Sequence, residues 1–317
     1  MDTLQTKADV SACNASAFPV LVQQIVEELL NANSLPEVSY LMGRILGAKH
    51  MVDFDALTPE QIAAVRESIQ PLMDESHFWE WAFSKPYGYP GDFLALEYCY
   101  DNEVGPQSSP LGKLLDRWLL GSQLASGVRE RKDMLEAFIE RRANIWHEAN
   151  NVPLRVLSLA SGSARELRDL SPEVQAKLDV TLIDQDPRSL EFATKFLPAS
   201  VKGRNSNALR LRPKDFEHPF DLVYSFGFFD YLKDDVIVHC LELCRDVLAP
   251  YGSVIFPLKM NSKYRHWFYD VFLDWRFIKR EREDGIKLAQ RAGLEVVEML
   301  ETENESVIFY HCVPQAM

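Results

Sequence analysis

The stretch Val156-Leu-Ser-Leu-Ala-Ser-Gly-Ser-Ala-Arg-Glu166 decides the fold class of this 317-residue chain. Its apolar start predicts a short strand, and the small residues Ala160 to Ser163 predict a tight turn. The run from Ala164 to Leu170 predicts a helix that begins at this turn. Small side chains let the backbone approach a ligand closely, and a helix start offers free N–H groups. The stretch therefore predicts a ligand-binding turn.

A second apolar run, 180–183, ends in Asp184-Gln185-Asp186-Pro187. Asp184 follows Gly162 by about 20 residues, which is the spacing of dinucleotide-binding units. An acid at the end of the second strand of such a unit is placed to bind ribose hydroxyls. The alternative role for Asp184 is to cap the helix that Pro187 begins.

The chain after residue 150 alternates strands with helices, which predicts a parallel sheet covered on both faces. The last two strands are separated only by Glu301–Asn304, so we expect them to form an antiparallel hairpin. The predicted strands are 154–159, 179–184, 202–204, 220–225, 252–258, 294–300 and 305–313, and the predicted helices are 163–170, 188–196, 234–248 and 282–292.

The first 150 residues are predicted to be almost wholly helical. Thr58, Pro59 and Gln61 form an N-cap signature for a helix that continues to Met73 or Trp81. The turn-rich segment 85–92 breaks the helical pattern, and Asp92 caps the next helix. The other predicted helices are 18–32, 35–50, 110–121 and 124–149. We therefore expect a helical lid or substrate domain at 1–150 and an α/β domain at 151–317.

Composition narrows the classes of partner. The net charge of −13 disfavours a nucleic-acid partner, because phosphate contacts need a basic face. The five cysteines are scattered, and Cys240 and Cys244 lack the second pair that a zinc site needs, so we expect reduced core thiols and no metal. Residues 1–16 carry no leader pattern and no apolar run reaches the length of a membrane span, which predicts a cytoplasmic protein. The oligomeric state stays open.

The ordered motifs resemble class I S-adenosylmethionine (SAM)-dependent methyltransferases over about 150–314. The family pattern acid-x-Gly-x-Gly-x-Gly falls on Ser158, Ala160, Gly162 and Ala164, so one glycine of three is present and serine replaces the acid. Companion motifs are Asn207-Ala208, 220–225 and 252–256. The resemblance implies a Rossmann-like, seven-stranded sheet behind an N-terminal all-helical domain, with SAM as cofactor and a small-molecule substrate.

A narrower resemblance covers roughly 75–314. It rests on 158–166, Gly227-Phe-Phe-Asp-Tyr-Leu232, Asp274-Trp275 and Gly88-Tyr-Pro-Gly-Asp92. These motifs resemble 3-hydroxypalmitic acid methyl ester biosynthesis methyltransferases and, in outline, azetidine-2-carboxylate synthases, which cyclise the aminobutyrate arm of SAM. Methyl transfer to a small or lipid-like acceptor such as a carboxylate is the first functional reading. The alternatives are a SAM cyclase that releases methylthioadenosine and a non-catalytic nucleotide-binding protein.

The resemblance also implies a cofactor site. In it, Asp184 binds the ribose and Asn207 binds adenine. Glu166 lies near the SAM ammonium or simply favours its helix dipole, and the Ser225 hydroxyl or carbonyl holds the ammonium. The expected cofactor-binding residues are Ala160, Ser161, Gly162, Glu166, Asp184, Gln185, Asn207, Ala208, Ser225 and Phe226.

The expected catalytic residues are Tyr87, Tyr89, Ser225, Asp230 and Tyr231. Asp230 and Tyr231 follow Ser225 by one turn and are placed to face the reaction centre; alternatively, Asp230 caps the helix near 234 and Tyr231 packs beneath it. The turn around Pro90-Gly91 suits a type II turn that presents tyrosines outward. Because aromatic faces attract cations, we expect Tyr87 or Tyr89 to cover the sulfonium as a lid. A helix–helix corner is the alternative.

Overall fold

The computed structural model describes residues 17–48, 57–261 and 266–315. The chain divides into a helical unit, Met1–Ser126 with Arg265–Arg276, and an α/β unit, Gly127–Tyr264 with Phe277–Met317. These units differ in two places from the domains expected at 1–150 and 151–317. Residues 127–150 join the α/β unit, because Phe138 stacks edge-on against His311 of the sheet at 4.9 Å. Residues 265–276 return to the helical unit, where the carbonyl of Asp270 accepts from Arg66.

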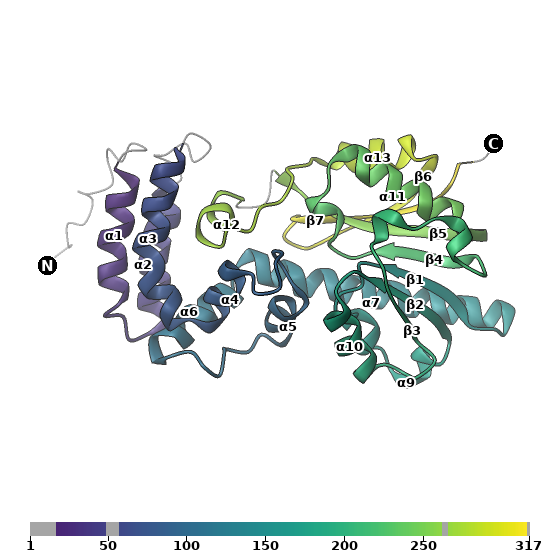
Figure 1. Cartoon of the computed structure of the whole chain (residues 1–317), viewed down its shortest axis with the longest axis horizontal. Coiled ribbons are helices and arrows are strands. Elements are labelled where there is room, and N and C mark those ends of the chain that lie inside the picture. Colours follow the sequence, from purple (N-terminus) through teal and green to yellow (C-terminus); the bar gives the residue numbers. More distant parts are fainter. Residues whose placement is uncertain (1–16, 49–56, 262–265, 316–317) are drawn as a thin grey trace, which may run out of the picture. The chain divides into compact units, whose positions relative to one another are not determined.

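The helical unit contains the predicted helices with one break that was not predicted (Figure 1). Ser76 separates two helices where a single helix to Trp81 was an option, because its hydroxyl accepts from Trp79 N and donates to the buried Asp116. The predicted Thr58 cap is confirmed: the Thr58 hydroxyl accepts from Gln61 N, and the Thr58 amide donates to Gln61 Oε1. The helices of the helical unit are α1 (Phe18–Leu29), α2 (Leu35–Gly47), α3 (Pro59–Glu75), α4 (His77–Ser84), α5 (Phe93–Asp101), α6 (Pro110–Leu120), the start of α7 (Gln123–Asn150) and α12 (His266–Phe272). The predicted end of the second helix, His50, lies outside the described residues.

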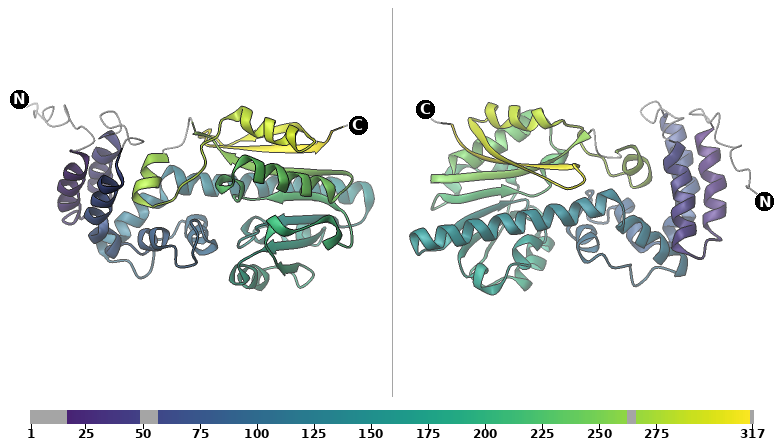
Figure 2. Two further views of the ribbon diagram at one scale, coloured as in Figure 1. Left: turned by 45° about the horizontal axis from the view of Figure 1, so that its top comes forward. Right: turned by 180° about the vertical axis from the view of Figure 1, so that it is seen from behind.

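The α/β unit is built on a seven-stranded sheet with the order β3-β2-β1-β4-β5-β7-β6. The first five strands in the chain pair with one another in parallel. β7 is antiparallel to both of its neighbours, β5 and β6, and its pairing with β6 confirms the predicted hairpin. Figure 2 shows α7 running along this sheet. The strands are β1 (Leu154–Leu159), β2 (Leu178–Asp184), β3 (Lys202–Asn205), β4 (Phe220–Ser225), β5 (Leu248–Lys259), β6 (Leu294–Glu301) and β7 (Val307–Pro314).

Helices cover both faces of this sheet. Leu157, Val223 and Phe256 belong to a buried core with α11 (Asp234–Asp246) and α13 (Arg282–Arg291) on one face. Tyr224 points to the other face, where it contacts α8 (Arg165–Arg168). The remaining helices are α9 (Pro172–Gln175) and α10 (Pro187–Phe196), with 3₁₀ turns η3 (Ala208–Arg210), η4 (Pro213–Asp215) and η5 (Phe229–Tyr231). The short helices α9 and α12 were not predicted.

The strand order reverses at β1, which lies between β2 and β4. In open parallel sheets, ligands bind in the crevice outside the carboxyl ends of the strands at such a reversal. The loops that follow β1, β2 and β4 meet at this crevice, so the fold places the predicted ligand-binding turn there.

Four cysteines, Cys99, Cys240, Cys244 and Cys312, are free and buried, as expected for core thiols; Cys13 lies outside the described residues. Burial raises the pKa of the Cys240 and Cys312 thiols to about 12. Within the described ranges, no helix is both long and apolar enough to cross a membrane.

An ion cluster fastens the turn after α4 within the helical unit. Asp274 accepts from Arg66 and from Lys85, each at 2.7 Å. Arg66 and Lys85 also lie over the Phe83 ring. Partial burial would raise the pKa of the Asp274 carboxyl, but the hydrogen bonds from Lys85 and Arg66 hold it below its ordinary value. The cluster joins residues that are 189 and 208 positions apart in the sequence.

Replacing Asp274 with Asn should destabilise the helical unit by about 1 kcal/mol near neutral pH, because the partly exposed cluster loses its charge. Asn tolerates the left-handed backbone of Asp274 (φ 47°), so the change isolates the charge. Because the folded pKa is depressed, the difference should hold above about pH 3.8 and vanish as the pH falls further. Urea unfolding across pH measures this. The control is Asp74→Asn, on the exposed face of α3. A loss of stability in Asp274→Asn that persists in acid, or an equal loss in the control, would contradict the role of the Asp274 charge.

Candidate functional site

The loop after β1 holds three left-handed residues at alternate positions. Their φ angles are 52° at Ala160, 55° at Gly162 and 50° at Ala164. These are the three positions where the resembling family carries glycine, and only glycine adopts this conformation without steric cost. The two alanines therefore keep the backbone shape of the glycine motif at the expense of local strain.

The carboxylate of Asp184 ties the loop after β1 to the loop after β2. Its Oδ2 accepts from Gly162 N and its Oδ1 accepts from Asp186 N, both at 2.8 Å. Ser161 N also donates to Ile183 O at 3.0 Å, so the two loops are joined by main chain as well. Burial raises the pKa of Asp184, against the opposing hydrogen bonds from the Asp186 and Gly162 amides.

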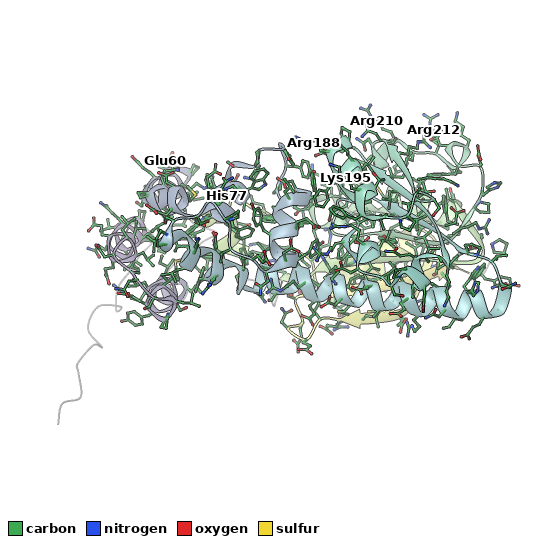
Figure 3. All side chains as sticks on the ribbon, turned by 90° about the horizontal axis from the view of Figure 1, so that it is seen from below. Glu60, His77, Arg188, Lys195, Arg210 and Arg212 are labelled. Atoms are coloured by element: carbon green, nitrogen blue, oxygen red, sulfur yellow. The ribbon has the colours of Figure 1, made fainter. Side chains whose placement is uncertain are left out.

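The alternative that Asp184 caps the following helix is wrong. Asp186 caps α10, accepting from Arg188 N at 3.0 Å and pairing with the Arg188 guanidinium. Figure 3 labels Arg188 with Lys195, Arg210 and Arg212, all four of which are exposed in this unit. Asp184 is thus left at the end of β2, facing the loop of Gly162.

The loop also contains a buried hydroxyl that has no hydrogen-bond partner among the described residues, and there is open space beside its backbone. The Ser161 hydroxyl is buried and has no hydrogen-bond partner among the described residues, and the same holds for the Ser158 hydroxyl. A Cβ added to Gly162 would meet no atom within 4 Å, so open space lies beside its backbone. Buried hydroxyls without a partner are rare, and this one lies at the crevice edge of the sheet.

Asn207, which is predicted to bind adenine, and its neighbour Ala208 lie at the start of η3. Asn207 caps this turn by accepting from Leu209 N at 2.9 Å, so it has a local structural role; its role in binding adenine stays a prediction. Ala208 is buried and Gln185 is exposed. Asn205, which was not predicted, donates to the carbonyls of Asp184 and Gln185 and thereby fixes the loop after β2.

Two predicted ammonium-binding residues lie around the end of β4. The Ser225 hydroxyl donates to Leu159 O at 3.2 Å across the β1–β4 pair. Glu166 is 1% exposed and accepts from the Tyr224 hydroxyl at 2.5 Å. Burial raises the pKa of the Glu166 carboxyl to about 7, against the Tyr224 hydrogen bond and the nearby Arg131 and Arg168 charges. Glu166 is therefore a buried carboxyl with a raised pKa, close to the end of β4.

The alternative role for Asp230, as the cap of the helix near residue 234, is wrong. Asp230 does not cap α11, whose N-cap is Lys233 without a side-chain bond. It is 2% exposed and accepts from Lys259 N at 2.9 Å, joining the loop after β4 to the end of β5. Tyr231 packs against Phe277 with ring centroids 5.4 Å apart. A direct catalytic role for either residue stays a prediction.

The sequence did not predict a role for Arg131, because a charged residue within a long helix is ordinarily expected to be exposed. It lies on α7 and is 3% exposed. Its guanidinium lies over the Phe226 ring at 4.5 Å and 3.5 Å from Asp230 Oδ2. The predicted residue Phe226 is therefore the platform of a buried arginine at the end of β4.

Tyr87 and Tyr89 lie in the helical unit, in a turn with positive φ at Gly88 and Gly91 that fits the predicted type II turn. The predicted cap by Asp92, which accepts from two amides of α5, is confirmed. Tyr87 packs between Trp81 and Phe93, with centroid distances of 5.6 and 5.5 Å, so it belongs to an aromatic cluster rather than standing free. The lid role involves both units and stays a prediction.

Comparison with known proteins supports this reading of the fold. A methyltransferase-domain family model matches residues 156–252, and a putative-methyltransferase family model matches 90–203. Over 99% of this chain and 100% of the other, the structure is similar to that of a possible exported protein from Bordetella parapertussis, with TM-score 0.58 and 14% identity. The α/β unit has the class I methyltransferase fold.

Two further similarities are shorter or weaker. Magnesium protoporphyrin IX methyltransferase from Synechocystis PCC 6803 aligns over 61% of this chain and 88% of its own, with TM-score 0.47 and 11% identity. A 91-residue segment, 28% of this chain, is 33% identical to the uncharacterized protein YnbC of Escherichia coli strain K12. The chain spans 15% of the length of that curated relative.

The strain at Ala160 leads to a stability prediction for the methyltransferase-like unit. Replacing Ala160 with Gly should raise the free energy of unfolding by about 0.5–1 kcal/mol, since relief of the left-handed strain exceeds the added entropy of the unfolded chain. Urea unfolding measures it. The control Ala137→Gly, at an exposed position within α7, should lower stability by about 1 kcal/mol. Equal losses in both variants would contradict a strained loop.

Glu166 leads to a prediction about pH. Because its folded pKa is raised, the stability contributed by the protonated form is complete below pH 4.5 and is lost as the pH rises to about 7. Glu166→Gln should therefore match the wild type in acid and exceed its stability by up to about 3 kcal/mol above neutral pH. Thermal unfolding across pH measures this, with the exposed Glu173→Gln as the control. A pH-independent difference would refute the raised pKa.

Proposed function

We propose that this protein is a SAM-dependent enzyme that transfers a methyl group to a small or lipid-like acceptor, such as a carboxylate. The observation that carries the proposal is the left-handed loop after β1 and its contact with Asp184 at the end of β2. The two methyltransferase family models cover this part of the chain, which supports the same cofactor.

The residues at the crevice fit SAM. A carboxylate oxygen has room for more than one hydrogen bond, so Asp184 can hold the loop amides and still accept from ribose hydroxyls. The Ser161 hydroxyl, which has no hydrogen-bond partner in the described part of the chain, and the open space beside Gly162 suit a ligand that lies close to the backbone. Glu166, when ionised, supplies a negative charge for a cationic ligand.

When bound, SAM supplies an electrophilic methyl group on a sulfonium cation. Transfer then depends on proximity, alignment and exclusion of water rather than on proton removal, provided that the acceptor is a carboxylate. A carboxylate is already ionised at neutral pH and needs no general base. In this reading the chain's residues bind and orient the reactants, and Glu166 balances charge.

Glu166 also favours a second candidate, the SAM cyclase. Cyclisation joins the amine nitrogen of the aminobutyrate arm to its γ-carbon and releases methylthioadenosine, so the ammonium must first lose a proton. A general base works best when its pKa is near the operating pH, and burial raises that of Glu166 to about 7. The narrower family resemblance includes enzymes of both kinds, so we carry this candidate beside methyl transfer.

Incubation with SAM followed by mass spectrometry separates these functions. Methyl transfer predicts no product from SAM alone and S-adenosylhomocysteine once a carboxylic acid acceptor is added. Cyclisation predicts methylthioadenosine and a four-carbon imino acid from SAM alone, above the uncatalysed background. Calorimetric binding of SAM with neither product would leave a nucleotide-binding protein without catalysis. No binding at all would overturn the proposal.

Asp184 tests the cofactor site itself. Asp184→Asn removes the charge that is expected to bind the ribose, so SAM should bind about 10- to 100-fold more weakly in calorimetry. Asp179→Asn, at the opposite end of β2, is the matched control and should bind SAM like the wild type. Equal affinity of both variants and the wild type would contradict the ribose role.

A further inference from the structure

Arg131 is a buried cation with little to compensate it. Its side chain is 4% exposed and its Nε has no hydrogen-bond partner among the described residues. Its one described ion pair, with Asp230, spans 3.5 Å, which is longer than a charge-assisted hydrogen bond. The second oxygen of Asp230 is taken by Lys259 N. Asp230 therefore offsets the charge of Arg131 without satisfying its donors.

Near neutral pH, Glu166 does not fully neutralise the positive charge of Arg131. Arg131 acts on Glu166 electrostatically, yet burial raises the pKa of that carboxyl to about 7, so much of it is uncharged. Burying a guanidinium is costly unless it is both paired and hydrogen-bonded. An additional anion beside Arg131 would balance its charge and accept hydrogen bonds from its guanidinium.

The position of Arg131 is at the crevice rather than deep in the core. Its guanidinium stacks on Phe226 and lies beside Gly227, both of which follow the carboxyl end of β4. A Cβ on Gly227 would approach both terminal nitrogens to 3.0 Å, so glycine leaves just enough room for the guanidinium. Ser225, at the same strand end, pairs with Leu159 at the start of the left-handed loop.

We propose that Arg131 binds a carboxylate of the ligand that occupies this crevice. The inference rests on the proposed function and names a group that the ligand must carry. A planar guanidinium offers paired donors that match a carboxylate. The carboxylate has two chemical sources, the aminobutyrate arm of SAM itself or an acidic acceptor, and ligands that differ in this one group distinguish them.

The test is calorimetry on the full chain and on Arg131→Gln, with three adenosine ligands. SAM carries the carboxylate, decarboxylated SAM lacks it, and methylthioadenosine lacks the whole arm. If the arm is the source, the variant should bind SAM about 10- to 100-fold more weakly and the other two unchanged. If an acceptor is the source, SAM binding should be unchanged, and binding of octanoate in the presence of S-adenosylhomocysteine should be lost.

Arg141→Gln, an exposed arginine on the same helix, is the matched control and should bind every probe like the wild type. Thermal unfolding of each variant checks folding. Equal loss of affinity for all three adenosine ligands, or no change for SAM and for octanoate, would overturn the inference. Failure of the wild type to bind SAM would instead overturn the proposed function.

Discussion

The carboxylate of Asp184 is the interaction on which the candidate site depends. It accepts from the amides of Gly162 and Asp186, so one side chain fixes the loops after two neighbouring strands. The left-handed turn at 160–164 is stable only because such contacts hold it, since two of its three left-handed residues are alanines.

Burial then determines what the crevice can do chemically. Glu166 and Arg131 are both almost inaccessible to water, and each contacts a residue at the end of β4 or directly after it. Their charges are therefore sensitive to whatever ligand enters. A cation favours ionisation of Glu166, and a carboxylate completes the donors of Arg131. A ligand with an ammonium, a sulfonium and a carboxylate matches both requirements, which links the proposed cofactor to particular side chains.

Much of the α/β unit could be predicted, because its strands are short apolar runs between clear turns. β1 and β4 begin and end where the sequence predicted, and Asp184 lies at the predicted strand end. The rest depended on contacts that no local pattern reveals. The break at Ser76 follows from a bond to Asp116, forty residues away, and α12 joins the helical unit through Asp274 and its distant cations. Arg131 is identified by its burial alone.

A crystal structure with S-adenosylhomocysteine tests the central claim most directly. The account predicts that the ligand lies in the crevice between the loop at 160–164 and the end of β4, with both ribose hydroxyls hydrogen-bonded to the Asp184 carboxylate. Density for the ligand elsewhere, or a ribose that makes no contact with Asp184, would contradict it.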